Sequence, residues 1–404
     1  MDPVQNPRRK TLISAVLLTI ALVLGLVSVD LVGRAPLHND FVEYWAAARV
    51  LLAGDNPYSP AAILAVEAPT GFAGKRPLLM FNPPWTLPFI LPFGAISYGR
   101  ASAVWLLFNL AIVFACADSL WREYGGVRQR RWLGWLLAAS FFPLLTALGL
   151  GQIGPLILLG LTVFLRYQVS RPLLAGAATI VIAVKPQLLY LFWIVLLLEC
   201  VRQRSWKLLA GSGGALLVAS LLPALLRPGV WRDYLELASS GNVLRNPSPN
   251  LGTLLRTIFG DHAWLQFVPP LFGAVWAVLF WRAQRRRWNW SGQLPLLLLV
   301  SLVTTAYGWL FDEIVLLPAV MQVAVPLARN PGRLRRQALA IYVGVNALMA
   351  LFVLVRETGT AYAWTAPAWL IVYVWLWWGI AAHSGPRGMD SGVATPLPEL
   401  HRLS

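Results

Sequence analysis

Residues 172–200 read PLLAGAATIVIAVKPQLLYLFWIVLLLEC, an apolar run whose only charged members are Lys185 and Glu199. The run is longer than the roughly 20 residues with which one helix crosses a bilayer. Pro186 lacks the amide hydrogen that a continuous helix needs, and a lysine in the middle of a bilayer is costly. We therefore expect two short helices that meet at a membrane surface near Lys185.

Comparable apolar runs occupy most of the chain. Of its 404 residues, 58% are hydrophobic and 12% are charged, against about 25% charged residues in soluble domains. This composition excludes a disordered chain, a fibrous repeat and an ordinary soluble domain. The other apolar runs lie near 12–32, 78–97, 101–121, 132–149, 152–167, 207–226, 264–281, 293–310, 312–329, 337–355 and 366–383. We expect an all-α polytopic membrane protein with about 12 transmembrane helices (roughly 11–13).

Two of these runs need separate interpretation. The run 12–32 follows three basic residues, exceeds the roughly 7–15 apolar residues of a secretory signal, and has no A-x-A cleavage site after it. We therefore expect a retained first transmembrane helix. The run 78–97 is dense in prolines, which break helices. We expect it to be re-entrant or to lie on the surface, with a kinked span as the alternative.

The net charge of +16 is distributed as a topology signal. Two thirds of the 33 Lys and Arg residues fall in short clusters between apolar runs. Because short cytoplasmic loops are enriched in these residues, we place the clusters, both termini and a flexible polar tail at 386–404 in the cytoplasm. Residues 1–385 then form a single domain in a cell (inner) membrane, with outer loops at about 34–100 and 228–263. These loops are rich in aromatic residues, Asn, Pro and Asp, so we expect an extracytoplasmic active site.

The first outer loop contains the clearest candidate for catalysis. Residues 41–53 predict a short amphipathic helix lying on the membrane surface, because apolar and aromatic side chains recur every three or four positions. Asp40 opens this helix and Glu43 follows three residues later. This spacing is typical of a helix cap, whereas the functional interpretation makes Asp40 an exposed general base. The two roles are compatible, because one carboxylate oxygen can cap while the other faces a substrate.

Three further polar residues fall on the same side of the predicted membrane. Lys185 either extends to the interface or binds a phosphate as a compact cation. Arg245 lies in a turn-rich loop, where it is either solvated or a second donor-phosphate ligand. Gln152 ends a tight turn, which is either a simple helix connection or a contact for a sugar or acceptor.

A second tight turn joins the runs 293–310 and 312–329. Its adjacent carboxylates, Asp312 and Glu313, are expensive at membrane depth and therefore indicate function, although Asp312 also fits a helix cap. We take both, with Glu43, as candidate supports for catalysis. Carboxylates at these positions and at Asp40 would bind a metal if they converged. We expect no metal and no other cofactor to be required.

Outer aromatic residues are candidates for stacking on a sugar or an acceptor. Tyr44 and Tyr58 lie in the first outer loop, and Tyr307 and Trp309 lie at the second turn. The alternative is that they belong to the belt of Trp and Tyr found at membrane interfaces.

Common nucleotide-binding and hydrolase motifs are absent from the sequence: it has no GxxxxGK[ST], no GxGxxG after a strand, no HExxH and no GxSxG. A group donor on the outer side must therefore act without a nucleotide, and a lipid carrier meets this requirement. A secondary transporter would show matching helix breaks in two halves. The breaks here do not pair, and the long first loop has no counterpart.

An ordered set of short motifs resembles glycosyltransferase family 87, within the GT-C superfamily of polytopic membrane glycosyltransferases. The resemblance extends over roughly residues 10–385. It rests on Asp40-Phe41 with Tyr44, Ala47, Gly54 and Asn56-Pro57-Tyr58; on Phe81-Asn82-Pro83-Pro84 with Pro88, Pro92, Ala103, Trp105 and Asn109; and on Gly151-Gln152, Lys185-Pro186 and Tyr307 to Asp312.

The resemblance implies a GT-C-like fold and an inverting glycosyltransferase. Such an enzyme would move a sugar, most often mannose, from a polyprenyl-phosphate carrier to a lipid or glycan acceptor on the extracytoplasmic face. The superfamily's catalytic acidic residue maps onto Asp40. The histidine that the family's mannosyltransferases carry near the last motif is missing between Tyr307 and Asp312. The implied partners are the donor, the acceptor and membrane lipids, with no nucleic acid. A polytopic transporter or flippase and a polyprenyl-pyrophosphate-glycan ligase stay open as alternatives.

Overall fold

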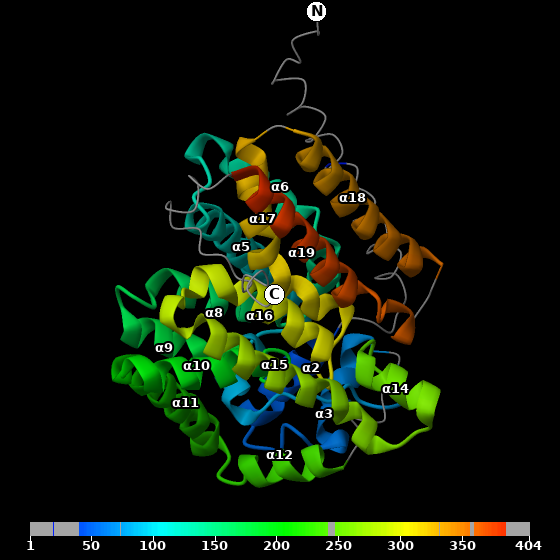
Figure 1. Ribbon diagram of the computed structural model, residues 1–404. Helices are drawn as coiled ribbons and strands as arrows, with labels where there is room; N and C mark the ends of the chain where they lie inside the picture. The colour runs from blue at the N-terminus through cyan, green and yellow to red at the C-terminus, as the bar shows by residue number, and fades with distance from the viewer. Residues whose placement is uncertain are drawn as a thin grey trace, which may run out of the picture.

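Every regular element that the computed structural model describes is a helix (Figure 1), so the expected all-α fold is confirmed for this part of the chain. The predicted first transmembrane helix at 12–32, apart from residue 19, lies outside the described part, as do Arg245 and the tail at 386–404. The structure describes residues 19, 40–72, 74–240, 247–330, 332–355 and 359–384.

The helices follow one another with short connections. They are α2 (Phe41–Leu52), α3 (Pro60–Glu67), α4 (Leu87–Gly94), α5 (Tyr98–Glu123), α6 (Arg131–Ala139), α7 (Phe142–Gly149), α8 (Gly154–Tyr167), α9 (Pro172–Ile182), α10 (Tyr190–Gln203), α11 (Trp206–Leu226), α12 (Val230–Ser239), α14 (Leu251–Phe259), α15 (Val268–Gln284), α16 (Trp290–Thr304), α17 (Leu317–Arg329), α18 (Arg333–Leu354) and α19 (Thr365–Ser384). Short 3-10 segments are η1 (Ala68–Thr70), η2 (Pro84–Thr86), η3 (Arg128–Arg130), η4 (Ala263–Phe267), η5 (Arg285–Arg287), η6 (Leu310–Leu316) and η7 (Gly359–Tyr362).

Among the described residues, six helices are long and apolar enough to cross a bilayer. A bent pair, α6 with α7, is angled by 63° and would make a seventh span. The six are Tyr98–Glu123, Trp206–Leu226, Ala263–Arg287, Leu310–Arg329, Arg333–Leu354 and Gly359–Ala382.

The expected number of about 12 spans is therefore not confirmed. The apolar helices α8, α9 and α16 contain 14, 11 and 15 residues. At 1.5 Å per residue they extend about 16–22 Å, which is less than the roughly 30 Å of a hydrocarbon core. Most of α8 is buried inside the protein. An apolar run thus marks a buried helix as readily as a spanning one.

The break expected near Lys185 is confirmed, because α9 ends at Ile182 and α10 begins at Tyr190. Backbone groups at such a break must find new partners in a protein interior or a bilayer. Side chains from two distant segments supply them. Asn82 Nδ2 donates to Val184 O at 2.9 Å, Trp85 Nε1 to Ala183 O at 2.8 Å, Ser301 Oγ to Leu188 O at 2.8 Å and Thr305 Oγ1 to Gln187 O at 2.9 Å.

The proline-rich run 78–97 does not form a spanning helix. It gives η2 and then α4, whose eight residues are too few for a kinked span. Asn82 and Trp85 belong to this run, so it holds the helix break from one side. Its other end packs against α2, where Gly94 faces Ala48.

The helix expected at 41–53 is present as α2, and most of it is buried inside the protein. Nine of its 12 residues are buried. Three consecutive alanines, Ala46, Ala47 and Ala48, have no exposed surface, and α2 packs against α3, α4 and α5. Small side chains allow this close packing on several sides. The helix ends at Leu52, and Gly54 follows its C-cap residue with a φ of 77°, in the left-handed region that favours glycine.

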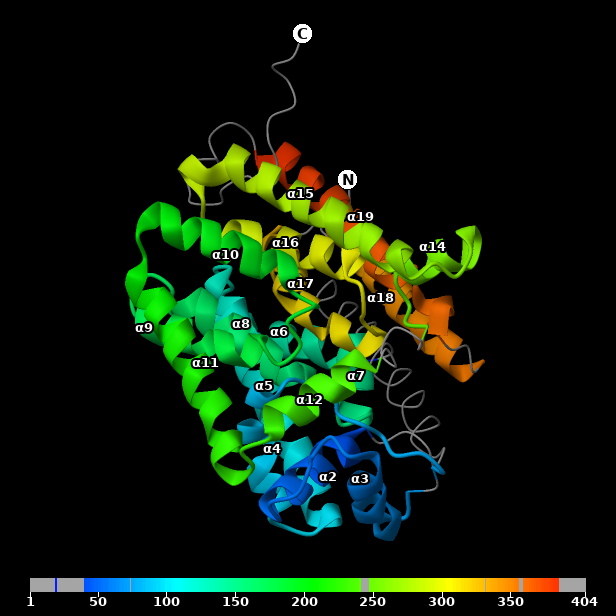
Figure 2. The ribbon, with the colours of Figure 1, turned by 90° about the horizontal axis from the view of Figure 1, so that it is seen from below.

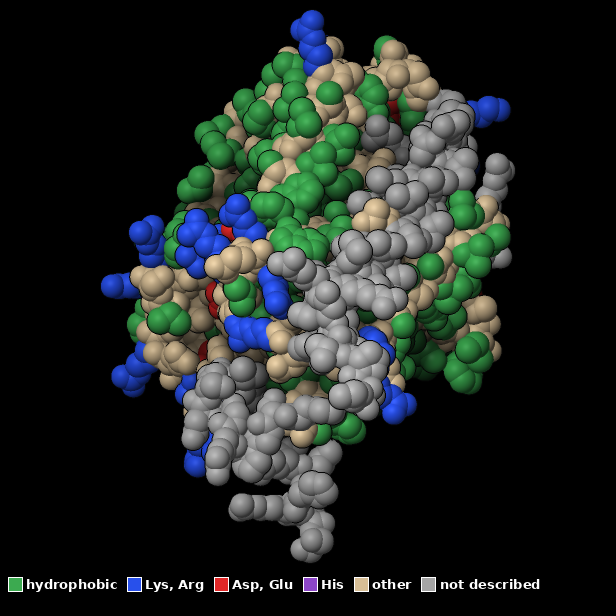
Figure 3. All heavy atoms as spheres, turned by 90° about the horizontal axis from the view of Figure 1, so that it is seen from above, with side chains coloured by type: hydrophobic (Ala, Val, Ile, Leu, Met, Phe, Trp, Pro, Cys, Tyr) green, Lys and Arg blue, Asp and Glu red, His purple; other side chains and the backbone are tan. Residues whose placement is uncertain are grey.

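The helices connect two chemically different ends of the molecule. α9 runs from Arg171 to the break at Lys185, α10 returns to Arg202, and α17 begins beyond Asp312 and ends at Arg329. Basic residues therefore cluster at the helix ends remote from Lys185 and Asp312. Figure 2 views the molecule from below and shows α2, α3 and α12 in the lower half of the picture. The opposite view, in Figure 3, shows many Lys and Arg side chains and few acidic ones.

We predict that Gly94→Ala destabilises the protein. A Cβ atom at this position would lie 2.7 Å from Ala48 Cβ and 2.7 Å from the Arg49 backbone nitrogen. Overpacking of this kind costs about 1–3 kcal/mol, so the melting temperature in detergent should fall. Gly99→Ala is the control, because nothing lies within 4 Å of its added Cβ. Equal melting temperatures for the two variants would contradict the close contact of α2 with α4.

Candidate active site

Gln152 joins the acidic residue of the first loop to the cation at the helix break. Its Nε2 donates to Asp40 Oδ2 at 2.6 Å. Its Oε1 accepts from Lys185 Nζ at 3.1 Å and from Tyr44 OH at 3.1 Å. Because an ammonium group only donates and a carboxylate only accepts, these partners allow the amide a single orientation. Residues from three separate segments thus form one polar network.

Lys185 also belongs to a buried ion pair. Its Nζ lies 2.8 Å from Asp312 Oδ1, with side-chain exposures of 13% for the lysine and 2% for the aspartate. Asp312 Oδ2 accepts the backbone N–H of Trp309 at 3.0 Å. The Phe311 ring lies 5.0 Å from the ammonium group, at a distance for a cation–π interaction. Both carboxylate oxygens of Asp312 therefore have hydrogen-bond donors, as a stable buried ion pair requires.

The turn after α7 determines where the Gln152 side chain lies. Gly151 has φ 68°, a conformation that favours glycine. Its carbonyl accepts from Trp105 Nε1 at 2.8 Å, and the Gln152 N–H donates to Ala147 O at 2.8 Å. The expected turn is therefore more than a connection, because it fixes a buried glutamine between α2 and the break at Lys185.

Asp40 does not cap α2 with its side chain, so that interpretation of the sequence was wrong. Its backbone carbonyl accepts the Glu43 N–H at 3.2 Å, while its carboxylate accepts from Gln152 instead. Asp40 is partly exposed. The polar network thus positions the carboxylate of a residue that is not fully buried.

Glu43 and Tyr307 share the electrostatic environment of this network. Burial raises the pKa of Glu43 well above its usual value, and the neighbouring Asp40 charge raises it further, whereas Lys185 lowers it. Burial also raises the pKa of Tyr307 to about 12, with contributions from Asp312, Glu43 and Asp40. A proton is therefore held more tightly on Glu43 than on an ordinary glutamate.

Aromatic side chains continue outward from the ion pair. Trp309 Nε1 donates to Tyr307 OH at 2.9 Å, and the two rings lie 6.2 Å apart, edge to face. Trp309 also stacks on Phe311 at 6.3 Å. All three side chains are partly exposed. Rings held in this way offer flat surfaces next to polar groups, which suits a sugar.

Two of the predicted site residues that the structure describes are not part of this network. Glu313 is buried and accepts from Thr365 Oγ1 at the start of α19. Tyr58 is also buried and donates its hydroxyl to the Asn82 carbonyl at 3.1 Å, so it supports the segment that holds the helix break. Arg245 lies outside the described residues.

Sequence reasoning did not assign a role to three residues that support the site. Phe311 contacts the Lys185 ammonium, Trp105 holds the Gly151 carbonyl, and Asn82 holds the helix break. Trp105 and Asn82 stood out only as members of the family motifs. A polar residue beside Pro83-Pro84 was a usable signal, since a buried amide needs partners.

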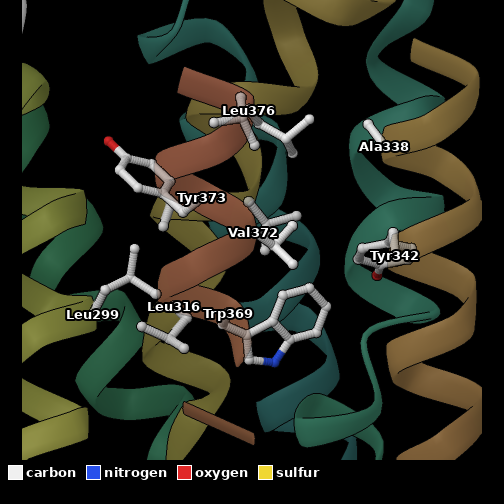
Figure 4. A pocket seen from close by; sticks show the side chains of 11 residues that line it. Leu299, Leu316, Ala338, Tyr342, Trp369, Val372, Tyr373 and Leu376 are labelled. Atoms are coloured by element: carbon white, nitrogen blue, oxygen red, sulfur yellow. The ribbon is translucent and has the colours of Figure 1, made fainter. Parts of the chain in front are cut away.

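Among the described residues, no group of three or more His, Cys, Asp or Glu side chains is arranged to hold a metal ion. Two apolar cavities with volumes of ≈ 50 and ≈ 100 Å³ lie beside α17, α18 and α19. Figure 4 shows the first of them, lined by side chains such as Tyr342, Trp369 and Leu376. No candidate site residue lines either cavity.

The described fold and the polar network define a multi-pass helical membrane protein with a charged site at one set of helix ends. The family model for glycosyltransferase family 87 matches residues 81–311, more than half of the chain, so the chain belongs to this family and is a membrane glycosyltransferase. The matched segment includes Gln152 and Lys185, while Asp40 precedes it and Asp312 follows it. No curated protein and no solved structure matches the chain.

We predict that Lys185→Met lowers the free energy of unfolding by about 3–5 kcal/mol, because it leaves the buried Asp312 carboxylate without its cation. The double variant Lys185→Met/Asp312→Asn should recover part of this loss. An asparagine oxygen still accepts the Trp309 N–H and carries no charge. Melting temperatures in detergent measure both effects, and a double variant less stable than the single one would contradict the ion pair.

Glu67 provides a test of pH dependence. Both its carboxylate oxygens accept the Leu78 N–H, at 3.3 and 3.2 Å, and burial raises its pKa from 4.5 to about 7. Between these values the folded state binds more protons than the unfolded state, so stability falls as pH rises through this window. Glu67→Gln removes this dependence.

The melting temperature of Glu67→Gln, relative to that of the unmodified protein, should therefore rise as pH increases from about 5 to about 8. Glu236→Gln, on the exposed face of α12, is the control and should show no such trend. A constant difference for Glu67→Gln across this range would show that the Glu67 pKa is not raised.

Proposed function

We propose that this protein is an inverting glycosyltransferase that uses a polyprenyl-phosphate-linked sugar, most often mannose in this family, and acts on the extracytoplasmic side. The acceptor is a lipid or glycan. The observation that carries this proposal is the single network in which Gln152 links the Asp40 carboxylate to the Lys185 ammonium. It combines a base with a cation, the two groups that such a transfer needs.

Asp40 is the proposed general base. It takes the proton of the acceptor hydroxyl while the hydroxyl oxygen forms a bond to the anomeric carbon. The bond from that carbon to the donor phosphate oxygen breaks at the same time, and its electron pair stays on the phosphate. Attack from the face opposite the leaving group inverts the anomeric carbon. A positioned carboxylate contributes about 10²–10⁴-fold to such a reaction.

Lys185 is the proposed partner of the leaving phosphate. Within the described part of the chain, Gln152 and Asp312 accept from this ammonium group, which has three N–H donors. One donor is then available for a phosphate oxygen. The ion pair with Asp312 reduces the net positive charge of the site, so Lys185 orients the phosphate more than it attracts it from a distance. Tyr307 and Trp309 are the proposed sugar-binding surface.

The arrangement of the helices supports an extracytoplasmic site. Arg171, Arg202 and Arg329 lie at helix ends remote from Lys185 and Asp312. Since cytoplasmic loops carry the excess of basic residues, the network belongs to the opposite face. A broken helix with a buried charge also occurs in transporters, but membership of a glycosyltransferase family favours the enzyme.

We predict that Asp40→Asn keeps the melting temperature and reduces sugar transfer by about 10²–10⁴-fold, because the amide retains the contact to Gln152 but does not take up a proton. Transfer is measured with purified protein and radiolabelled polyprenyl-phosphate sugars, among them mannose. Asp55→Asn is the control, since Asp55 is exposed in the same loop and its change should leave transfer intact. Full activity in Asp40→Asn would end the assignment of the base.

A further inference from the structure

Apolar side chains cover the outer face of a hairpin formed by α14, η4 and the start of α15. Ile258 and Phe259, at the end of α14, are 69% and 66% exposed, and Trp264 in η4 is 64% exposed. The surface continues along α15 through Phe267, Leu271 and Phe272, which are also exposed. Figure 2 shows α14 at the edge of the molecule, at the beginning of α15.

The inner face of the same hairpin is polar and tied to the site segment. Asn250 caps α14 by accepting the Thr253 N–H at 2.9 Å. Asn250 Nδ2 and Gln266 Nε2 both donate to the carbonyl of Ala306, the residue before Tyr307. Gly252 packs so closely on the Gln266 backbone that an added Cβ would lie 2.8 Å from its carbonyl oxygen. The hairpin is therefore fixed to the segment at Ala306 through its polar inner face, and its apolar face points outward.

The bilayer is the partner that this surface fits. The surface is continuous with the exposed face of the candidate span Ala263–Arg287, on which Leu271, Val275 and Leu279 point outward. These side chains face lipid if the span crosses the membrane. The hairpin lies at the start of that span, where the hydrocarbon core meets the head groups. Its tip carries Asp261 and His262, and Trp264 is of the residue type enriched at that boundary.

We propose that the α14–η4 hairpin is an interfacial membrane element, seated in the head-group region of the leaflet on the side of the polar network. Ile258 and Phe259 insert toward the acyl chains, as apolar faces of interfacial helices do. Asp261 and the ion pair that it forms with Arg256 stay at the level of water and head groups. The membrane surface then fixes the position of Ala306 and of the segment that follows it. This proposal does not depend on the reaction that the network performs.

Spin labels on single cysteines test this placement. Full-length Phe259→Cys and Ile258→Cys proteins are labelled and reconstituted in vesicles of phosphatidylethanolamine and phosphatidylglycerol. The two native cysteines, Cys116 and Cys200, are buried and should not react. Lys75→Cys is the control, because Lys75 and its neighbour Arg76 are exposed in the loop before η2.

We expect labels at 258 and 259 to be more accessible to oxygen, which concentrates in lipid, than to a water-soluble nickel chelate. The label at 75 should show the reverse order. Greater accessibility of labels 258 and 259 to the chelate would place the hairpin in water and overturn the proposal. Low accessibility to both reagents would indicate a protein partner on this surface, such as a second copy of the chain, and would also overturn it.

Discussion

The fixed orientation of one amide group is the constraint on which the site depends. Lys185 and Tyr44 both donate to the oxygen of Gln152, so its nitrogen must face Asp40. Reversing the amide would place its N–H₂ group against an ammonium and its oxygen against a carboxylate, and it would lose these hydrogen bonds. The ion pair with Asp312 holds Lys185 in place and thereby fixes the acceptor that the amide must meet. The Asp40 carboxylate, which is the proposed base, and the Lys185 ammonium are thus positioned relative to each other by a residue that need not react.

The fold serves this network by satisfying the backbone wherever a helix is interrupted. The break between α9 and α10 brings Lys185 to the site, and Asn82, Trp85, Ser301 and Thr305 provide the hydrogen bonds that the interrupted helix lacks. These side chains come from both sides of the break in sequence, so the position of Lys185 depends on the early proline-rich segment and on the late turn together. An unsatisfied break in an apolar surrounding would cost several kcal/mol per group.

Local chemistry made some of these features predictable. Pro186 within an apolar run predicted the helix break, and the spacing of apolar residues predicted the helix α2. Predictions from the sequence were less useful where segments far apart in the chain determine which side chains are buried and which partners they meet. The spacing of Asp40 and Glu43 is that of a cap, yet Gln152 is the partner of the Asp40 carboxylate. The alanines of α2 suit an exposed or a buried helix, and only its packing against α3, α4 and α5 distinguishes them. Asp312 and Glu313 are adjacent, but Glu313 accepts a hydrogen bond from Thr365, and only Asp312 pairs with Lys185.

A double-mutant cycle on Asp40 and Gln152 tests the central claim most directly, with sugar transfer as the readout. Gln152→Met alone should slow transfer by about 10–10²-fold, because the proposed base, Asp40, loses its fixed position. In the Asp40→Asn background the same change should have little further effect, since the base that Gln152 positions is already absent. Rate reductions that simply multiply in the double variant would show that Gln152 and Asp40 act independently, and would contradict this account of the site.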